Sequence, residues 1–331
     1  MSGRKILVVG GAGYIGSHMV KMLAGVEDAV VVLDNLSTGF ADAARFADQL
    51  VVGDLADEVL LDQLFTDHQF DGVMHFAAAS LVGESMVNPS KYYRNNVSNT
   101  LNLLDAMVKH SVKHLVFSST AAIFGEPEYT PIDEDHPKNP INPYGASKLM
   151  IERMLEDYAA AYGLNSVSLR YFNACGADPE GELGERHDPE THLIPLVLQA
   201  ASGRRESISI FGTDYPTPDG TCVRDYIHIV DLCDAHLKGI AAMLSGQLAG
   251  AHAFNLGNGE GFSVREVIQG ASDVVAADDK QITVVEQARR AGDPATLVAT
   301  SKRANAVLSW RPAHPALEGM IADAWRWEKS L

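Results

Sequence analysis

A tyrosine and a lysine stand four positions apart in the segment PYGASK, at Tyr144 and Lys148. Pro143 can open a helix, so the two side chains would lie one turn apart on the same helical face. A nearby ammonium stabilises phenolate over phenol, which lowers the tyrosine pKa toward neutrality and makes a usable general base. Taken alone the spacing is a weak signal, because a half-buried tyrosine and a solvated lysine also satisfy it.

A hydroxyl side chain stands where it could join this pair. The segment FSSTAAIFG ends a predicted buried strand and places Thr120 at the carboxyl edge of that strand. The helix that carries Tyr144 and Lys148 follows the loop after this strand. Hydroxyl, phenol and ammonium would then line one crevice, so we predict these three residues as the catalytic group.

A glycine-rich turn, GGAGYIG, lies between the first predicted strand and the first predicted helix. The spacing of Gly10, Gly13 and Gly16 lets the backbone turn sharply and approach a pyrophosphate at the helix N-terminus. Asp34 ends the next strand, where its carboxylate can accept hydrogen bonds from an adenosine ribose and would repel a 2′-phosphate. The pattern therefore predicts NAD in preference to NADP. Asp54, after the third strand, could either contact the adenine edge or cap the following helix.

The elements that must hold these groups alternate between strand and helix. Apolar runs predict strands of a parallel sheet, buried on both faces, at residues 5–10, 29–34, 49–54, 72–77, 114–119 and 166–172. Apolar residues three and four apart predict crossover helices at 14–25, 57–68, 92–110 and 143–163. This is the pattern of an α/β fold with a doubly wound, Rossmann-type parallel sheet.

The pattern loosens after about residue 176 into stretches rich in Gly, Pro and acidic residues. We therefore expect a nucleotide-binding domain at 1–175, rejoined by about 224–256. A second, smaller α/β lobe would occupy 176–331.

Composition excludes several classes of protein. The 331 residues carry a net charge of −17, which disfavours nucleic-acid and anionic-membrane surfaces because neutralising phosphates requires clustered cations. No apolar run is long enough to span a bilayer, and the N-terminus lacks the apolar core of a signal peptide. Three cysteines without CxxC spacing, and His110 and His114 without a third ligand, predict no metal site. A reducing, cytoplasmic location fits this composition.

The glycine turn, the hydroxyl after the fifth strand and the YxxxK helix resemble the extended short-chain dehydrogenase/reductase family. Longer segments are more specific and resemble the UDP-glucose 4-epimerases within it, nearly from end to end. These segments are GGAGYIGSH, LDNLSTG, HFAAASLVGESM, YYRNNVSNTLNLL, FSSTAAIFGEP, NPYGASKLMIE, LRYFNACGADP, THLIP, IFGTDYPTPDGTCVRDYIHIVDL, NLGNGEGFSVREV and RRAGDPATLVA.

The resemblance implies a reaction of galactose metabolism, the interconversion of UDP-glucose and UDP-galactose. Tyr144 would take the proton from the sugar 4-hydroxyl while C4 gives its hydride to the nicotinamide, and a bound 4-ketose would form and turn over. Hydride return to the opposite sugar face inverts C4, so NAD would stay bound. Lys148 would hold the nicotinamide ribose and keep Tyr144 acidic, while Thr120 would bond the 4-oxygen.

The resemblance also implies ligand contacts and an assembly. The cofactor would be lined by Gly10, Gly13, Tyr14, Ile15, Gly16, Asp34, Asn35, Asp54, Leu55, Phe76, Ala77, Asn95, Tyr144, Lys148 and Tyr171. The UDP-sugar would be held by Thr120, Tyr144, Asn173, His192, Leu193, Phe211, Arg224, Arg290 and Asp293, with the two arginines opposing the diphosphate. The helices at about 91–110 and 143–162 would pair with their copies in a homodimer.

Some positions depart from the family pattern, and others separate the possible reactions. Thr120 replaces a frequent serine, and Ser80 replaces a lysine that some members place on the cofactor diphosphate. Leu297 falls where the family sets room for the sugar 2-substituent, so N-acetylhexosamine or arabinose nucleotides stay open as substrates. A dehydratase would need an acidic pair directly after the threonine, where this chain has Ala121 and Ala122.

Two further functions are compatible with part of this pattern. A net NAD-dependent dehydrogenase would use free cofactor, and the amount of NADH would change in proportion to the substrate converted. A non-catalytic dinucleotide sensor would have no need of the tyrosine base.

Overall fold

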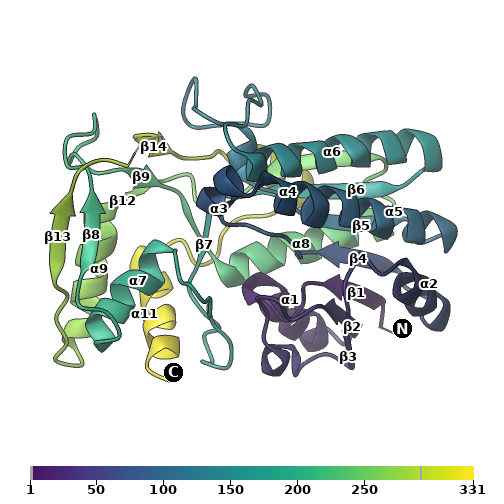
Figure 1. The fold of residues 1–331 in the computed structure, drawn as a ribbon, viewed down its shortest axis with the longest axis horizontal. Helices are drawn as coiled ribbons and strands as arrows, with labels where there is room; N and C mark the ends of the chain where they lie inside the picture. The colour runs from purple at the N-terminus through teal and green to yellow at the C-terminus, as the bar shows by residue number, and fades with distance from the viewer. Residues whose placement is uncertain (1–2, 291–292) are drawn as a thin grey trace.

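A parallel sheet of seven strands is the largest element of the computed structural model, which describes residues 3–290 and 293–331 (Figure 1). Every neighbouring pair of strands in it runs parallel. Across the sheet the order is β11 (Ala251–Asn255), β6 (Asn165–Arg170), β5 (His114–Ser118), β4 (Gly72–His75), β1 (Lys5–Val9), β2 (Ala29–Asp34) and β3 (Gln49–Val52). The predicted doubly wound α/β class is confirmed.

The direction of winding reverses between β1 and β4. From β1 the chain adds β2 and β3 on one side, then crosses to β4, β5 and β6 on the other. Ligands of open parallel sheets bind in the crevice that such a reversal leaves at the carboxyl ends of the strands. Gly10 follows β1 and Phe76 follows β4, so both lie at this switch point.

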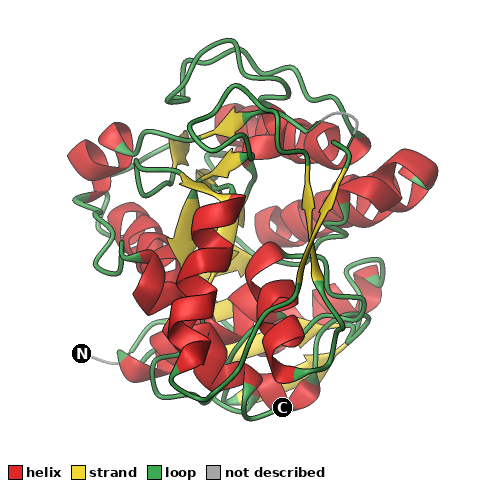
Figure 2. Ribbon diagram, turned by 90° about the vertical axis from the view of Figure 1, so that its left-hand side faces the viewer, coloured by secondary structure: helices red, strands yellow, loops and turns green. Residues whose placement is uncertain are grey.

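Helices cover both faces of the sheet (Figure 2). One face packs on α2 (Glu58–Asp67), α5 (Asn99–Lys109) and α6 (Pro143–Tyr162), and the other on α1 (Tyr14–Gly25) and α8 (Ile229–Leu244). The five inner strands between them are almost fully buried, as in a sheet sandwiched by crossover helices, whereas the edge strands β3 and β11 are partly exposed.

The C-terminal region also contributes to this sheet domain. Helix α10 (Lys302–Leu308) and the buried Trp310 join the core beneath α8, and Trp310 Nε1 donates a hydrogen bond to the Asp231 carbonyl at 2.9 Å. The predicted division gives these residues to the second lobe. Their return depends on an aromatic anchor far along the chain, which no local pattern marks.

A separate hydrophobic core lies beside the sheet domain, at the left of Figure 1. It is built from α7 (Leu193–Ser202), α9 (Val264–Ala276), α11 (Leu317–Glu328) and β8 (Ile208–Phe211), and the exposed strand β13 (Val284–Gln287) pairs with β8. Short strands stand between the two cores, namely β7 (Asn173–Cys175), β9 (Val223–Arg224), β10 (Tyr226–His228), β12 (Phe262–Ser263) and β14 (Thr296–Leu297). The exact domain boundaries stay a prediction.

One predicted helix, at 92–110, is interrupted. After the short helices α3 (Val82–Val87) and α4 (Pro89–Tyr92), a π-helical stretch spans Tyr93–Ser98 before α5 begins. Within it the Asn96 side chain donates to the Ala79 carbonyl and to Ser147 Oγ of α6, each at 3.0 Å. π-Turns are frequent at functional sites because they redirect side chains. None of the helices in the described ranges is long and apolar enough to cross a membrane.

Candidate active site

The catalytic helix α6 begins as the sequence predicts. Asn142 caps it by accepting a hydrogen bond from the Gly145 amide at 2.8 Å, and Pro143 occupies its first turn. Tyr144 and Lys148 therefore lie one turn apart, with the Lys148 Nζ 6.0 Å from the centre of the tyrosine ring. Lys148 is 3% exposed, and its ammonium donates to the Ser118 carbonyl at the end of β5, at 2.8 Å.

Burial dominates the electrostatics of this pair. It lowers the pKa of Lys148 to about 7, against a smaller upward effect of Glu152. It also raises the pKa of Tyr144, while the hydrogen bond with Thr120 acts in the opposite direction. The prediction that Lys148 by itself lowers the tyrosine pKa is therefore wrong for this structure. Removing the phenol from water outweighs an ammonium that is itself desolvated and turned toward a backbone carbonyl.

Hydroxyl groups gather at the ends of the neighbouring strands. Thr120 Oγ1 accepts a hydrogen bond from the Ala122 amide at 3.1 Å, which fixes the threonine at the start of a 3₁₀ turn, Ala121–Ile123. Ser118 and Tyr171 are joined by a short hydrogen bond between their hydroxyls. Thr120, Tyr144 and Tyr171 thus present three hydroxyls at the carboxyl edge of β5 and β6.

Each of the three positions in the first turn is occupied by glycine for a different structural reason. Gly10 adopts a positive φ of 81°, and a Cβ there would come within 2.5 Å of the Ala77 amide nitrogen. A Cβ on Gly16 would lie 2.1 Å from the Gly10 carbonyl oxygen. Gly13 is the N-cap of α1 and its Cβ direction is open, meeting only the Gly10 oxygen at 3.5 Å. The turn is therefore closely packed behind and leaves the helix N-terminus accessible in front.

Acidic side chains at the next two strand ends are held in place by local hydrogen bonds. Asp34 accepts from the amides of Ala12 at 2.9 Å and Leu36 at 2.8 Å, which fixes its carboxylate beside the glycine turn. Asn35 Nδ2 donates to Asp54 Oδ2 at 2.6 Å.

Of the two roles open for Asp54, the structure excludes helix capping. Asp57 caps α2, accepting from the Leu60 amide at 3.0 Å. Asp54 instead lines the cavity described next.

A cavity of about 700 Å³ connects these groups with the second lobe. Its wall includes all predicted catalytic and cofactor residues, which are Gly10, Gly13, Tyr14, Ile15, Gly16, Asp34, Asn35, Asp54, Leu55, Phe76, Ala77, Asn95, Thr120, Tyr144, Lys148 and Tyr171. Of the predicted sugar-nucleotide residues it includes Asn173, His192, Arg224 and Asp293, but not Leu193, Phe211 or Arg290. Which ligand atoms these residues contact stays a prediction.

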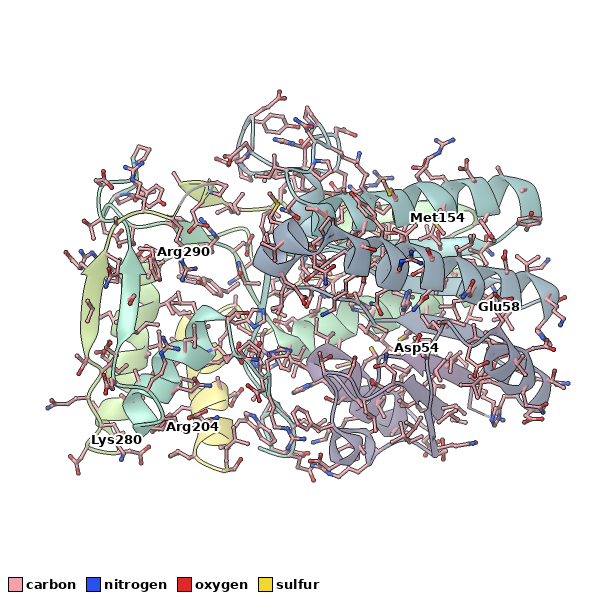
Figure 3. The ribbon with its side chains drawn as sticks, viewed as in Figure 1. Asp54, Glu58, Met154, Arg204, Lys280 and Arg290 are labelled. Carbon is pink, nitrogen blue, oxygen red and sulfur yellow. The ribbon has the colours of Figure 1, made fainter. Side chains whose placement is uncertain are left out.

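The residues outside the wall have other partners. Arg290 is exposed and stacks on Phe211, with its guanidinium 3.7 Å from the ring centre. Arg224 Nη2 lies 3.6 Å from Asp293 Oδ1 at the wall itself. In Figure 3, Arg290 lies on the side of β8 and Asp54 lies in the sheet domain, so these two residues come from opposite lobes.

A cluster that the sequence reasoning missed borders the same cavity. Glu185 and His187 are in its wall together with His192, and Glu190 lies behind them. Burial alone would lower the histidine pKa values, but the two carboxylates raise that of His187 to about 9 and that of His192 to about 10. The signal was present as two glutamates and two histidines within the segment ERHDPETH.

The donor set fits the predicted cofactor. An open helix N-terminus, a fixed carboxylate at Asp34 and a cavity continuous to Tyr144 suit a dinucleotide with an unmodified ribose. A family model, the NAD dependent epimerase/dehydratase family, matches residues 6–257. The chain belongs to this family.

Relatives place the chain more closely among the UDP-glucose 4-epimerases. The UDP-glucose 4-epimerase of Halalkalibacterium halodurans is 52% identical over 324 residues, which cover 98% of this chain and 95% of that protein. The crystal structure of the Brucella ovis UDP-glucose 4-epimerase in complex with NAD has a TM-score of 0.93 and 48% identity, covering 97% of both chains.

A more distant family member was crystallised with both ligands. The Bifidobacterium longum UDP-glucose 4-epimerase in complex with NAD⁺ and UDP has a TM-score of 0.91 and 36% identity, covering 98% of both chains. The predicted class, an NAD-dependent nucleotide-sugar 4-epimerase, is confirmed.

Proposed function

We propose that this epimerase interconverts UDP-glucose and UDP-galactose and retains NAD through the reaction. The observation that carries the proposal is one continuous cavity. Its wall includes the glycine turn, Arg224, and Tyr144 together with Thr120 and Lys148. Such a cavity can hold a dinucleotide and a sugar nucleotide with their reactive ends meeting at the tyrosine.

The proposed roles follow from the hydrogen bonds of these groups. Tyr144 exchanges the proton of the sugar 4-hydroxyl, and Thr120, which lines the same cavity, stabilises the 4-oxygen. The Lys148 ammonium, held at the Ser118 carbonyl, contacts the nicotinamide ribose. When bound, NAD supplies the acceptor and donor of the hydride.

We further propose that the remaining predicted residues divide by lobe. The glycine turn, Asp34 and Asn35 hold the dinucleotide, with Asp54 near its adenine. Arg224, Asn173, Leu193, Phe211 and Asp293 hold UDP. Arg290 would have to leave Phe211 to reach a diphosphate, so its contribution depends on a side-chain movement.

The structure also bears on the competing reactions. Ala121 and Ala122 line the cavity directly after Thr120, where a dehydratase would need an acid to expel water. Leu297 also lines the cavity and pairs with Arg224 between β14 and β9. A leucine leaves more room than an aromatic ring would, so an N-acetylhexosamine nucleotide is the alternative substrate.

We propose a cytoplasmic homodimer acting in galactose metabolism. Three free cysteines, all buried, fit a reducing compartment. Large apolar side chains are exposed along the π-helical stretch, α5 and α6, at Tyr93, Leu101 and Met150. An exposed apolar face of this kind favours pairing with a second copy. Light scattering should give twice the chain mass for the wild type and a lower mass for Met150→Glu.

The activity is tested by NMR of the anomeric protons of UDP-galactose mixed with purified protein, without added NAD. Conversion to a mixture of UDP-glucose and UDP-galactose is expected, and Tyr144→Phe should abolish it. Tyr162→Phe, at an exposed position near the end of the same helix, is the matched control and should remain active. No conversion, even with NAD supplied, would overturn the proposal.

A further inference from the structure

The loop that precedes α7 gathers four metal-ligating side chains. One ligand atom from each lies within 4.8 Å of all the others. The side chains of both glutamates are almost buried, with exposed fractions of 6% for Glu185 and 5% for Glu190. Two buried carboxylates held together need compensating positive charge.

The four groups converge on a point rather than forming two separate pairs. His192 Nδ1 lies 2.7 Å from Glu185 and 2.9 Å from Glu190, while His187 Nδ1 lies 3.1 Å and 3.6 Å from the same two carboxylates. Despite these distances, the buried His187 Nδ1 makes no hydrogen bond of acceptable geometry. Ligands of a tetrahedral zinc ion lie about 3.3 Å apart, since zinc bonds to nitrogen and oxygen are about 2.0–2.2 Å long.

The carboxylate of Glu190 is also fixed from behind. Its Oε1 accepts hydrogen bonds from the amides of Thr191 at 2.7 Å and His192 at 2.8 Å. Such outer hydrogen bonds orient ligands around protein-bound metals. We propose that one zinc ion binds this loop, held by Glu185, His187, Glu190 and His192.

A nearby acidic cluster shows the contrast. Asp178, Glu180 and Glu182 also lie close together, but the Lys21 ammonium stands among them, 2.9 Å from Asp178 and 2.6 Å from each glutamate. Its positive charge is therefore supplied by the chain. No lysine or arginine forms an ion pair with Glu185 or Glu190 among the described residues.

The zinc site is structural, because four protein ligands complete the tetrahedron. It joins three elements at the cavity wall. The Tyr14 ring at the start of α1 meets His187 edge-on at 6.4 Å, and His192 is the N-cap of α7. Trp327 of α11 donates to the Glu185 carbonyl at 3.0 Å. Zinc would hold the wall that these elements share.

Metal content is the first test, made on untagged protein dialysed against metal-free buffer. Elemental analysis should find close to one zinc per chain, as purified or after equimolar Zn²⁺ and desalting. Less than one tenth of a zinc per chain under both conditions would overturn the proposal, and the cluster would then be histidine–glutamate ion pairs alone.

Variants locate the metal. His187→Ala and Glu190→Gln should each lower zinc content at least tenfold. His110→Ala should keep it, because His110 pairs with Asp62 at 2.7 Å outside the cavity wall. Wild-type zinc content in the loop variants would overturn the assignment.

Thermal unfolding gives a readout that does not depend on these variants. A chelator that strips zinc from the wild type should lower its Tm by several degrees, and added Zn²⁺ should restore it. Removal of zinc without a change in Tm would overturn the structural role.

Discussion

Glu152 accepts two hydrogen bonds from Arg170 in the interior of the sheet domain, at 2.9 Å from Nε and 2.6 Å from Nη2. Both side chains are less than a tenth exposed. Ser119 Oγ donates to the same carboxylate at 2.6 Å. Because Glu152 lies one turn beyond Lys148, this network fixes the catalytic helix α6 against the ends of β5 and β6.

Removing one partner of this pair should destabilise the protein strongly. Arg170→Met leaves the Glu152 carboxylate buried without its cation, which should lower the free energy of unfolding by about 3–5 kcal/mol. The double variant Arg170→Met/Glu152→Leu should recover most of the loss. Urea unfolding measures the free energy of unfolding of both variants. Arg153→Met, in an exposed pair on the same helix, is the control and should cost less than about 1 kcal/mol.

The buried lysine predicts a pH dependence of stability. Its pKa is lowered from 10.5 to about 7 in the folded protein, so between these values the unfolded chain binds the additional proton. Stability should therefore rise with pH across this range, by about 1.4 kcal/mol per unit from Lys148 alone.

The difference between wild type and Lys148→Met isolates this effect. The two free energies of unfolding, measured from pH 7 to pH 9.5, should diverge as pH rises, in favour of the wild type. Lys91→Met, on α4, controls for the loss of a lysine elsewhere. Parallel curves for the wild type and Lys148→Met would show that burial does not perturb this ammonium.

Two substitutions of Thr120 should separate the effect of its hydroxyl group from the effect of its side-chain shape. Thr120→Ser keeps the hydroxyl and should retain activity within a few-fold. Thr120→Val should lower kcat by about 10²–10³, the usual effect of removing a hydrogen-bond donor to a developing oxyanion. It should also cost about 1 kcal/mol of stability, because Oγ1 caps the Ala122 amide. Equal activity of the two variants would remove Thr120 from the chemistry.

The parts of the site that were predictable from sequence are those whose geometry depends on local spacing. The glycine turn and the Tyr144–Lys148 pair each lie within seven consecutive residues, so backbone geometry determines their relative positions. The alternation of apolar runs and amphipathic segments likewise fixed the class of sheet. Strand ends of a parallel sheet share one edge, which is why Asp34 and Thr120 line the same cavity.

The features of the site that could not be predicted depend on packing between segments far apart in the sequence. The raised pKa of Tyr144 depends on how completely the surrounding elements exclude water, and no spacing encodes that. Arg290 stacks on Phe211 because β13 pairs with β8, a contact between segments about 80 residues apart. The Glu185 and His187 cluster was local, yet its chemistry became visible only when distances showed the side chains converging.

Leu297 should set the tolerance for a substituent at the sugar 2-position. It lines the cavity and is half-buried, so its volume limits the space beside Arg224. Leu297→Ala should raise the ratio of kcat/KM for UDP-N-acetylglucosamine over UDP-galactose by about tenfold, and Leu297→Tyr should lower it by a similar factor. Val285→Ala, at an exposed position on β13 outside the cavity wall, should leave the ratio unchanged. If both Leu297 variants keep the wild-type ratio, other side chains determine the substrate range.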